Sequence, residues 1–273
     1  MLTKSSAHVH TQYCDGRSTA EEMVRAALAL GLVSLGFSSH APQTFGRPCC
    51  VLPAEMPAYR REIQRLKTAC AGRLAIYTGL EVDYFACEPP TGCDYFIASV
   101  HYMPEGHTPV DGKPEELRAY IDHYCGGNGM ELAKRYFELL VKHTTQCRPD
   151  IIGHFDLLRK NNARLHFLDE ESPAYRRLAL DALSALRPIG ALLEVNTGAM
   201  ARGVLSTPYP AAFLLRAWRD MGGEVMVNSD CHFADKLAYG YDEAEALLRA
   251  SGFDHAYRLG RGNEKWVAYS LIA

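Results

Sequence analysis

The sequence lacks the features that mark a membrane, secreted or nucleic-acid-binding protein. Its first residues contain no apolar run of the signal-peptide kind, and no stretch approaches the roughly 18 apolar residues of a spanning helix. The nine cysteines form no C-x-x-C pair, and the adjacent Cys49 and Cys50 are poorly placed for a disulfide. A formal charge of −3 offers no basic surface to nucleic acid or to an anionic membrane. We therefore expect a cytoplasmic protein with reduced thiols and with neither nucleic acid nor membrane as a partner.

Two catalytic motifs are also missing. No G-x-G-x-x-G follows the first expected strand, which argues against a Rossmann dinucleotide site. No D-x-D-x-T/V segment is present to carry an aspartyl-phosphate intermediate. Low-complexity tracts and linker-like composition are absent as well, so residues 1–273 are expected to form a single domain.

The sequence does contain short apolar runs that alternate with helical patterns. Strands are expected near residues 7–10, 34–38, 74–80, 95–100, 151–153, 191–195 and 224–228, with a closing or edge strand at 266–271. Helices are expected at 18–30, 53–71, 115–124, 128–145, 173–186, 210–221 and 242–250, the first opening on a capping-box pattern at 18–21 and the fourth on Asn128. This alternation predicts an α/β fold with a parallel sheet, and the length and repetition favour a barrel over an open sheet.

Histidines and acids recur at the C-terminal ends of the expected strands. Six of the eleven histidines lie at such an end or up to two residues past it, namely His8, His10, His40, His101, His154 and His232. Glu81 and Asp230 take the same position, and Asp15 lies in the loop after the first strand. Catalytic groups gather at this edge of a parallel barrel, so the nine side chains are expected to converge. The remaining histidines fall in helices or loops and are expected at the surface: His107, His123, His143, His166 and His255.

The spacing of these residues indicates metal binding. Side chains along a strand alternate with period two, so His8 and His10 project from one face, and Asp230 and His232 repeat this spacing. A single histidine at a strand end is usually structural, but nine polar groups buried together without a cation would be costly. Nitrogen and oxygen ligands without thiolate suit Zn, Mn or Fe, and nine ligands are too many for one tetrahedral ion. We therefore expect two to three divalent metal ions.

With these residues in place, the sequence resembles the PHP (polymerase and histidinol phosphatase) family, and within it the monofunctional histidinol-phosphatase branch. The matching segments run along nearly the whole chain: His8-Val9-His10 with Asp15-Gly16, residues 36–42, Gly79-Leu80-Glu81, Ser99-Val100-His101, residues 152–156, Glu194-Val195-Asn196-Thr197, and Ser229-Asp230-Cys231-His232. The resemblance implies a distorted (β/α)7 TIM-like barrel, with a trinuclear metal site at the C-terminal face of its strands.

The resemblance also implies how the ligands are shared among three ions. The first would be held by His8, His10, Glu81 and Asp230. The second would share the bridging Glu81 and be bound by His101 and His154. The third would be held by Asp15, His40 and His232; some relatives have histidine at the position of Asp15. Glu81, Asp230 and His232 would in this way serve catalysis.

Two arginines match positions that hold the substrate phosphate in this branch. They are Arg159, five residues past His154, and Arg202, in the loop after Thr197. A planar guanidinium suits bidentate binding of phosphate, and both residues follow expected barrel strands.

The expected activity is hydrolysis of a phosphate monoester by a metal-bridging hydroxide that attacks phosphorus in line. The first candidate is an L-histidinol-phosphate phosphatase of histidine biosynthesis, whose partner is a small-molecule phosphate ester. The same site could instead act on nucleotides or other small phosphomonoesters. A nuclease module is disfavoured by the missing polymerase region and the absence of a basic stripe. A metal-binding protein without catalysis is disfavoured by the intact ligand set.

Overall fold

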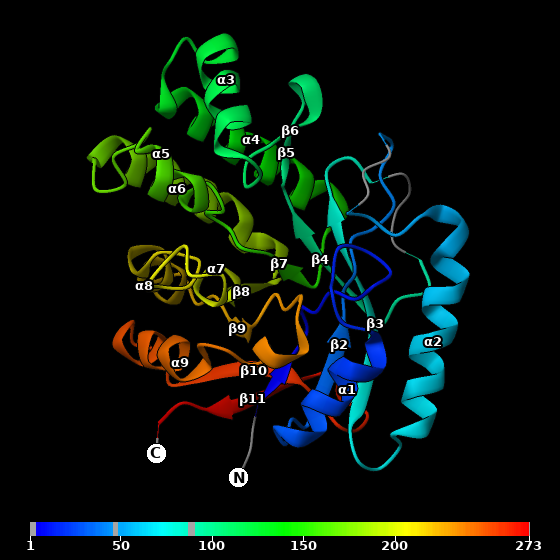
Figure 1. Ribbon diagram of the computed structural model, residues 1–273. Coiled ribbons are helices and arrows are strands. Elements are labelled where there is room, and N and C mark those ends of the chain that lie inside the picture. Colours follow the sequence, from blue (N-terminus) through cyan, green and yellow to red (C-terminus); the bar gives the residue numbers. More distant parts are fainter. Residues whose placement is uncertain (1–3, 46–48, 87–90, 273) are drawn as a thin grey trace.

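The computed structural model describes residues 4–45, 49–86 and 91–272. Within this part, nine strands form one sheet in the order β1-β2-β3-β4-β7-β8-β9-β10-β11, with the helices on its outer side (Figure 1). The strands of this sheet are β1 (Ser5–Ser6), β2 (Ser34–Phe37), β3 (Ala75–Asp83), β4 (Tyr95–Ser99), β7 (Ile151–Ile152), β8 (Leu192–Asn196), β9 (Val225–Asn228), β10 (His255–Leu259) and β11 (Trp266–Ser270). The helices are α1 (Ala20–Ala29), α2 (Met56–Ala69), α3 (Pro114–Tyr124), α4 (Gly129–Cys147), α5 (Arg159–Leu165), α6 (Pro173–Leu186), α7 (Gly198–Ala201), α8 (Ala212–Asp220) and α9 (Tyr241–Ala250).

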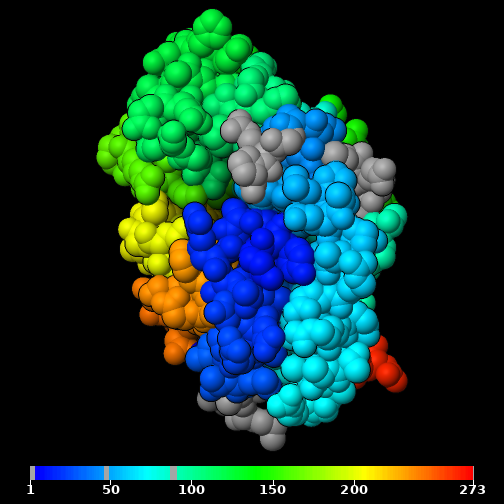
Figure 2. Space-filling view, turned by 45° about the vertical axis from the view of Figure 1, so that its right-hand side comes forward, coloured from blue at the N-terminus to red at the C-terminus, as the bar shows by residue number. Residues whose placement is uncertain are grey.

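The sheet curves into a barrel in which the chain segments that follow β1 and β9 meet at the C-terminal rim. Neighbouring strands from β1 to β10 pair in parallel, and only β10 and β11 are antiparallel. Past β1 and β9, Val9 and Cys231 form an isolated parallel bridge. The N–H of His10 donates to the Cys231 carbonyl at 2.8 Å, and the N–H of Cys231 donates to the His8 carbonyl at 3.2 Å. Figure 2 shows the result on the surface, where the dark-blue N-terminal segment lies between the orange C-terminal part and the cyan α2.

At the opposite rim β10 enters the seam. Tyr257 of β10 pairs with Met226 of β9, and the N–H of Leu259 donates to the Ser5 hydroxyl at 3.3 Å. Strands β1 and β9 therefore approach each other at the C-terminal rim, whereas β10 lies between them at the N-terminal rim. This confirms the expected distorted parallel barrel and gives the distortion its structural cause.

Most expected elements form near their expected positions, but several features differ. The first helix is capped by Thr19, whose hydroxyl accepts from the N–H of Glu22 while the Glu22 carboxylate accepts from the N–H of Thr19, so the capping box lies one residue later than expected. Helix α5, between β7 and α6, was not expected. Strand β10 was not expected, and the final run forms an antiparallel edge strand against it.

A packed apolar floor lies inside the barrel beneath the C-terminal rim. Tyr95 of β4 is buried there, and its hydroxyl donates to the Ala7 carbonyl at 2.5 Å. A Cβ on Gly79 of β3 would lie 2.4 Å from the Tyr95 ring, so only glycine leaves room for the tyrosine. Strand side chains alternate, and Glu81, two residues further along β3, points to the same interior one layer higher.

Two features of the described residues bear on the protein's surroundings. Each of the eight described cysteines carries a free thiol. Of the helices in residues 4–45, 49–86 and 91–272, none is long and apolar enough to span a membrane.

Candidate metal centre

The nine expected ligand residues come together at the C-terminal rim of the barrel. They surround the floor of a cavity of about 730 Å³. Seven of them line it: Asp15, His40, Glu81, His101, His154, Asp230 and His232. His8 and His10 lie on either side of the seam residue Val9 and have no exposed surface.

Glu81 lies at the centre of this group. Its Oε2 is 3.1 Å from His8 Nε2, 3.3 Å from His10 Nε2 and 3.1 Å from His40 Nδ1. The other oxygen, Oε1, is 3.0 Å from His154 Nε2 and 3.4 Å from His101 Nε2. The carboxylate therefore has three imidazoles near one oxygen and two near the other, so it could be a ligand that two cations share.

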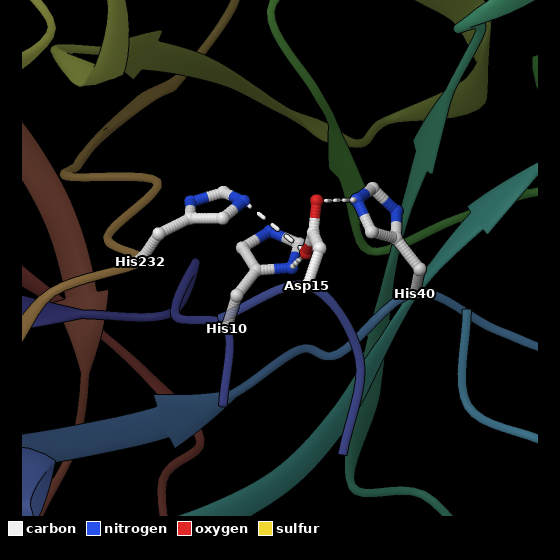
Figure 3. Close-up of side chains that lie close together, drawn as sticks. All are labelled: His10, Asp15, His40 and His232. Atoms are coloured by element: carbon white, nitrogen blue, oxygen red, sulfur yellow. Dashed lines mark ion pairs between the residues drawn. The ribbon is translucent and has the colours of Figure 1, made fainter. Parts of the chain in front are cut away.

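Asp15 occupies the outer side of the cluster. Its Oδ1 lies 3.3 Å from His232 Nε2 and 3.5 Å from His10 Nδ1, and its Oδ2 lies 3.7 Å from His40 Nε2. Figure 3 shows the Asp15 carboxylate between the rings of His232 and His40, with the ring of His10 beside it. The loop after β1 thus brings a carboxylate to histidines from the ends of β2 and β9.

Several of these atoms are buried without a hydrogen-bond partner. Among the described residues they include His8 Nε2, His10 Nε2, Asp15 Oδ1 and Glu81 Oε2. Unpartnered polar atoms that converge in a buried site are costly unless a cation joins them, and this donor set fits one. Three groups have ligand atoms within 4.8 Å of one another: His10, Asp15, His40 and His232; His8, His10 and Asp230; His40, Glu81 and His101.

These groups differ in part from the division that the resemblance implies. His10 and His40 each belong to two groups, whereas the resemblance gives each of them to one ion. The imidazoles of His10 and His40 therefore lie between neighbouring candidate metal positions, and the assignment of each ligand to one ion stays a prediction.

The electrostatics of the site follow from burial and mutual proximity. Burial alone would raise the pKa of the Glu81 carboxyl, but His8, His101 and His40 outweigh it and hold the pKa well below its ordinary value. Burial lowers the pKa of His40 to about 4, opposed by Glu81 and Asp15. His40 is therefore a neutral imidazole near pH 7, which is the form that binds a metal.

Two carboxylates outside the expected ligand set, one of them in the matching segment 194–197, support the ligands from behind. Glu194 of β8 contacts His8 Nδ1 at 2.6 Å and accepts from the N–H of His154 at 2.8 Å. Asp83 of β3 accepts from the N–H of His101 at 2.7 Å and lies 3.3 Å from its Nδ1. In the sequence, Glu194 could have been noticed as an acid inside an apolar run. Asp83 could have been noticed as an acid two residues past Glu81 on the same strand face.

Of the two arginines expected to bind phosphate, one lines the cavity in the structure and the other does not. Arg202 lines the cavity, with its Nη2 2.9 Å from Asp230 Oδ2. Arg159 does not line it: the guanidinium donates to Glu170 Oε2 at 3.1 Å and to the Pro208 carbonyl at 3.1 Å. The next residue, Lys160, does line the cavity, and its Nζ is 2.7 Å from Asp111 Oδ2. Arg202 and Lys160 are thus among the cations that line the cavity, with Arg17 and Lys236, and Arg159 lies behind it.

The contact between Arg202 and Asp230 depends on local backbone geometry. Asp230 has a φ of 47°, in the left-handed region that aspartate adopts more readily than most residues. Behind the pair, a Cβ on Gly198 would lie 2.7 Å from Asp230 Oδ2 and 2.7 Å from Arg202 Nη2. Glycine at 198 therefore allows the arginine and the carboxylate to meet.

One histidine expected at the surface is in the interior. His143 of α4 is 5% exposed, and its Nε2 lies 2.9 Å from the Val82 carbonyl. It faces β3 because it falls on the buried stripe of α4 with Leu139 and Leu140.

A parallel barrel whose C-terminal rim gathers imidazoles and carboxylates in a cavity has the arrangement of a metal-dependent barrel enzyme. Residues 6–198 match the family model of the PHP domain. The chain belongs to this family.

Three proteins that are similar to this chain carry the name histidinol phosphatase or histidinol phosphate phosphatase. A Deinococcus radiodurans protein named "Probable histidinol-phosphatase" is 32% identical over 257 residues, which cover 90% of this chain and 93% of the relative. The histidinol-phosphatase of Bacillus subtilis is 26% identical over 88% of this chain and 98% of its own length. A solved histidinol phosphate phosphatase from Lactococcus lactis, complexed with zinc, L-histidinol and phosphate, superposes with a TM-score of 0.71 at 21% identity, covering 96% of this chain and 98% of the other. At that identity the last likeness shows the fold.

Proposed function

We propose that this protein is a metal-dependent phosphatase that hydrolyses L-histidinol phosphate in histidine biosynthesis. The observation that carries the proposal is the cluster of six imidazoles and three carboxylates on the floor of a cavity that also presents Arg202 and Lys160. The names of the Deinococcus and Bacillus relatives support the choice of substrate.

Two to three divalent ions would be held by the nine clustered side chains. Zinc, which the Lactococcus lactis structure contains, is the first candidate, and manganese or iron would accept the same nitrogen and oxygen donors. Such ions supply Lewis acidity and lower the pKa of a water molecule toward 7. The position of Glu81, with imidazoles around both oxygens, supports its role as the shared ligand.

The chain's own residues would bind and orient the phosphate. Arg202 is held in place by Asp230, and Lys160 by Asp111. Two fixed cations in the cavity can bind the non-bridging oxygens and stabilise the charge that develops during transfer. Asp230 and His232 contact Arg202 and also face the cluster, so they would hold the guanidinium, and the phosphate that it binds, beside the metal ions.

The direct test is steady-state kinetics after metal reconstitution. Chelated protein is reloaded with Zn²⁺, Mn²⁺ or Fe²⁺, and kcat/KM is compared for histidinol phosphate, nucleoside monophosphates and p-nitrophenyl phosphate. Charged contacts to the rest of a cognate substrate are worth about 1.5–3 kcal/mol each, so we expect at least a tenfold preference for histidinol phosphate. Equal kcat/KM for p-nitrophenyl phosphate would contradict the substrate assignment while leaving the phosphatase activity intact.

A further inference from the structure

Glu194 occupies a position that no ligand assignment includes. Its side chain is completely buried in the middle of β8, directly behind the cluster. Oε1 lies 2.6 Å from His8 Nδ1 and 3.0 Å from Asn228 Nδ2. Oε2 accepts from the N–H of His154 at 2.8 Å and from Asn196 Nδ2 at 2.9 Å. One carboxylate therefore contacts two expected ligand residues, one through each oxygen.

Two asparagines fix the direction of these hydrogen bonds. The Oδ1 atoms of Asn228 and Asn196 each accept from a backbone N–H, at 2.8 and 2.9 Å. Each amide therefore turns its NH2 group toward Glu194, where the N–H of His154 is a third donor. A carboxylate with three donors around it accepts from His8 as well, so Nδ1 of His8 carries the proton. In the neutral form of this imidazole, which is the form that binds a metal, the lone pair is then on Nε2, the atom that faces the cluster.

We propose that Glu194 is a positioning residue that orients His8 and His154 together, so that one buried carboxylate couples the ligand sets of two cations. The inference rests on the metal cluster of the proposed function. Histidine ligands commonly donate their second N–H to a carboxylate, which fixes the ring and raises its basicity. Here the same carboxylate also fixes the backbone of a second ligand residue. The described contacts of Asp83, by contrast, include one expected ligand residue, His101, and the N–H of Phe85.

The substitution Glu194→Gln separates this role from simple packing, because glutamine has the same shape. Its NH2 group must face one of the two donor pairs. If it faces His8, the ring accommodates it only by accepting at Nδ1 and carrying its proton on Nε2, which removes the lone pair. If it faces His154, two N–H groups oppose each other and the backbone shifts. Either arrangement disturbs His8 or His154. Because residue 194 contacts both, we expect the substitution to affect both ligands.

The experiment measures stepwise Zn²⁺ binding to the chelated protein by competition with a chromophoric chelator, and metal content by mass spectrometry after dialysis. Loss of such a supporting carboxylate typically weakens metal binding about 10–100-fold. We expect Glu194→Gln to weaken two binding steps, and Asp83→Asn to weaken one. Glu224→Gln is the matched control: that carboxylate contacts His255 Nε2 at 3.0 Å at the opposite end of β9, and metal binding should not change.

The outcomes are distinct. Wild-type protein that binds no metal would overturn the metal centre of the proposed function. Metal-binding wild type with an unchanged Glu194→Gln variant would overturn the present inference alone, and so would a variant that weakens only one step. If Glu194→Gln does not fold, Glu194→Asp keeps the charge but is one methylene shorter, so it can reach only one donor pair. That variant should weaken at least one step, and binding of all ions as tightly as in the wild type would count against the proposal.

Discussion

Arg159 and Lys160 are neighbours in the chain, and we predict that methionine at 159 lowers thermal stability whereas methionine at 160 lowers catalytic efficiency. Arg159 is behind the cavity, where its guanidinium donates to Glu170 and Pro208 and lies 3.7 Å from the fully buried Asp156. Removing one partner of a buried ion pair costs about 3–5 kcal/mol. Because Asp156 keeps a hydrogen bond from the Ala211 N–H, we take the lower end, about 3 kcal/mol. At about 2–4 °C per kcal/mol for a chain of this size, Arg159→Met should lower Tm by about 6–12 °C.

Lys160→Met should instead change the kinetics. Lys160 lines the cavity, and a lost hydrogen bond to a charged phosphate is worth about 1.5–3 kcal/mol, or roughly 10–100-fold in kcat/KM. Thermal unfolding and steady-state kinetics are measured on both variants, with Lys134→Met, at an exposed position of α4, as the control. A tenfold loss of kcat/KM in Arg159→Met at unchanged Tm, together with normal kinetics in Lys160→Met, would refute this placement of the two side chains.

Three further substitutions test the site. Glu81→Ala removes the carboxylate that contacts five imidazoles, so we expect loss of metal and of nearly all turnover; full metal occupancy by mass spectrometry would contradict this. Arg202→Ala should raise KM for the phosphate ester with the metals retained, and unchanged kinetics would exclude Arg202 from phosphate binding. Gly198→Ala places a methyl group against Arg202 and Asp230, so it should destabilise the protein by about 1–3 kcal/mol and lower kcat/KM; a wild-type Tm and kcat/KM would show that the site accommodates a Cβ.

The convergence of the nine side chains was predictable because it depends on two regular properties. The C-terminal ends of parallel strands meet at one rim, and strand side chains alternate. Residues as distant in sequence as His10 and His232 could therefore be expected side by side, and their rings stack 4.2 Å apart.

Other features depend on geometry that residue spacing does not express. The α5 helix begins at Arg159, and successive helical residues point about 100° apart. Without that helix in the prediction, the sequence could not distinguish Arg159 from Lys160. Glu194 occupies a strand position where an apolar residue is usual, and only the positions of its donors in three dimensions give it a role. Strand β10 lies in the seam where β1 and β9 diverge, and no local sequence pattern predicts that divergence.

The closing seam of the barrel and the metal cluster share the same residues, so metal binding should hold the barrel closed. The backbone bonds across the seam join His8 and His10 to Cys231, whose neighbours Asp230 and His232 are expected ligands. Each metal ion at 100 times its Kd would stabilise the folded state by about 2.7 kcal/mol, so chelation of even one ion should lower Tm by about 5–11 °C. Hydrogen exchange should then increase first at residues 7–12 and 226–232, while the packed pair α4 and α6 stays protected. If exchange rose equally in the seam and in these helices, the cations would stabilise the fold as a whole and would not close the seam.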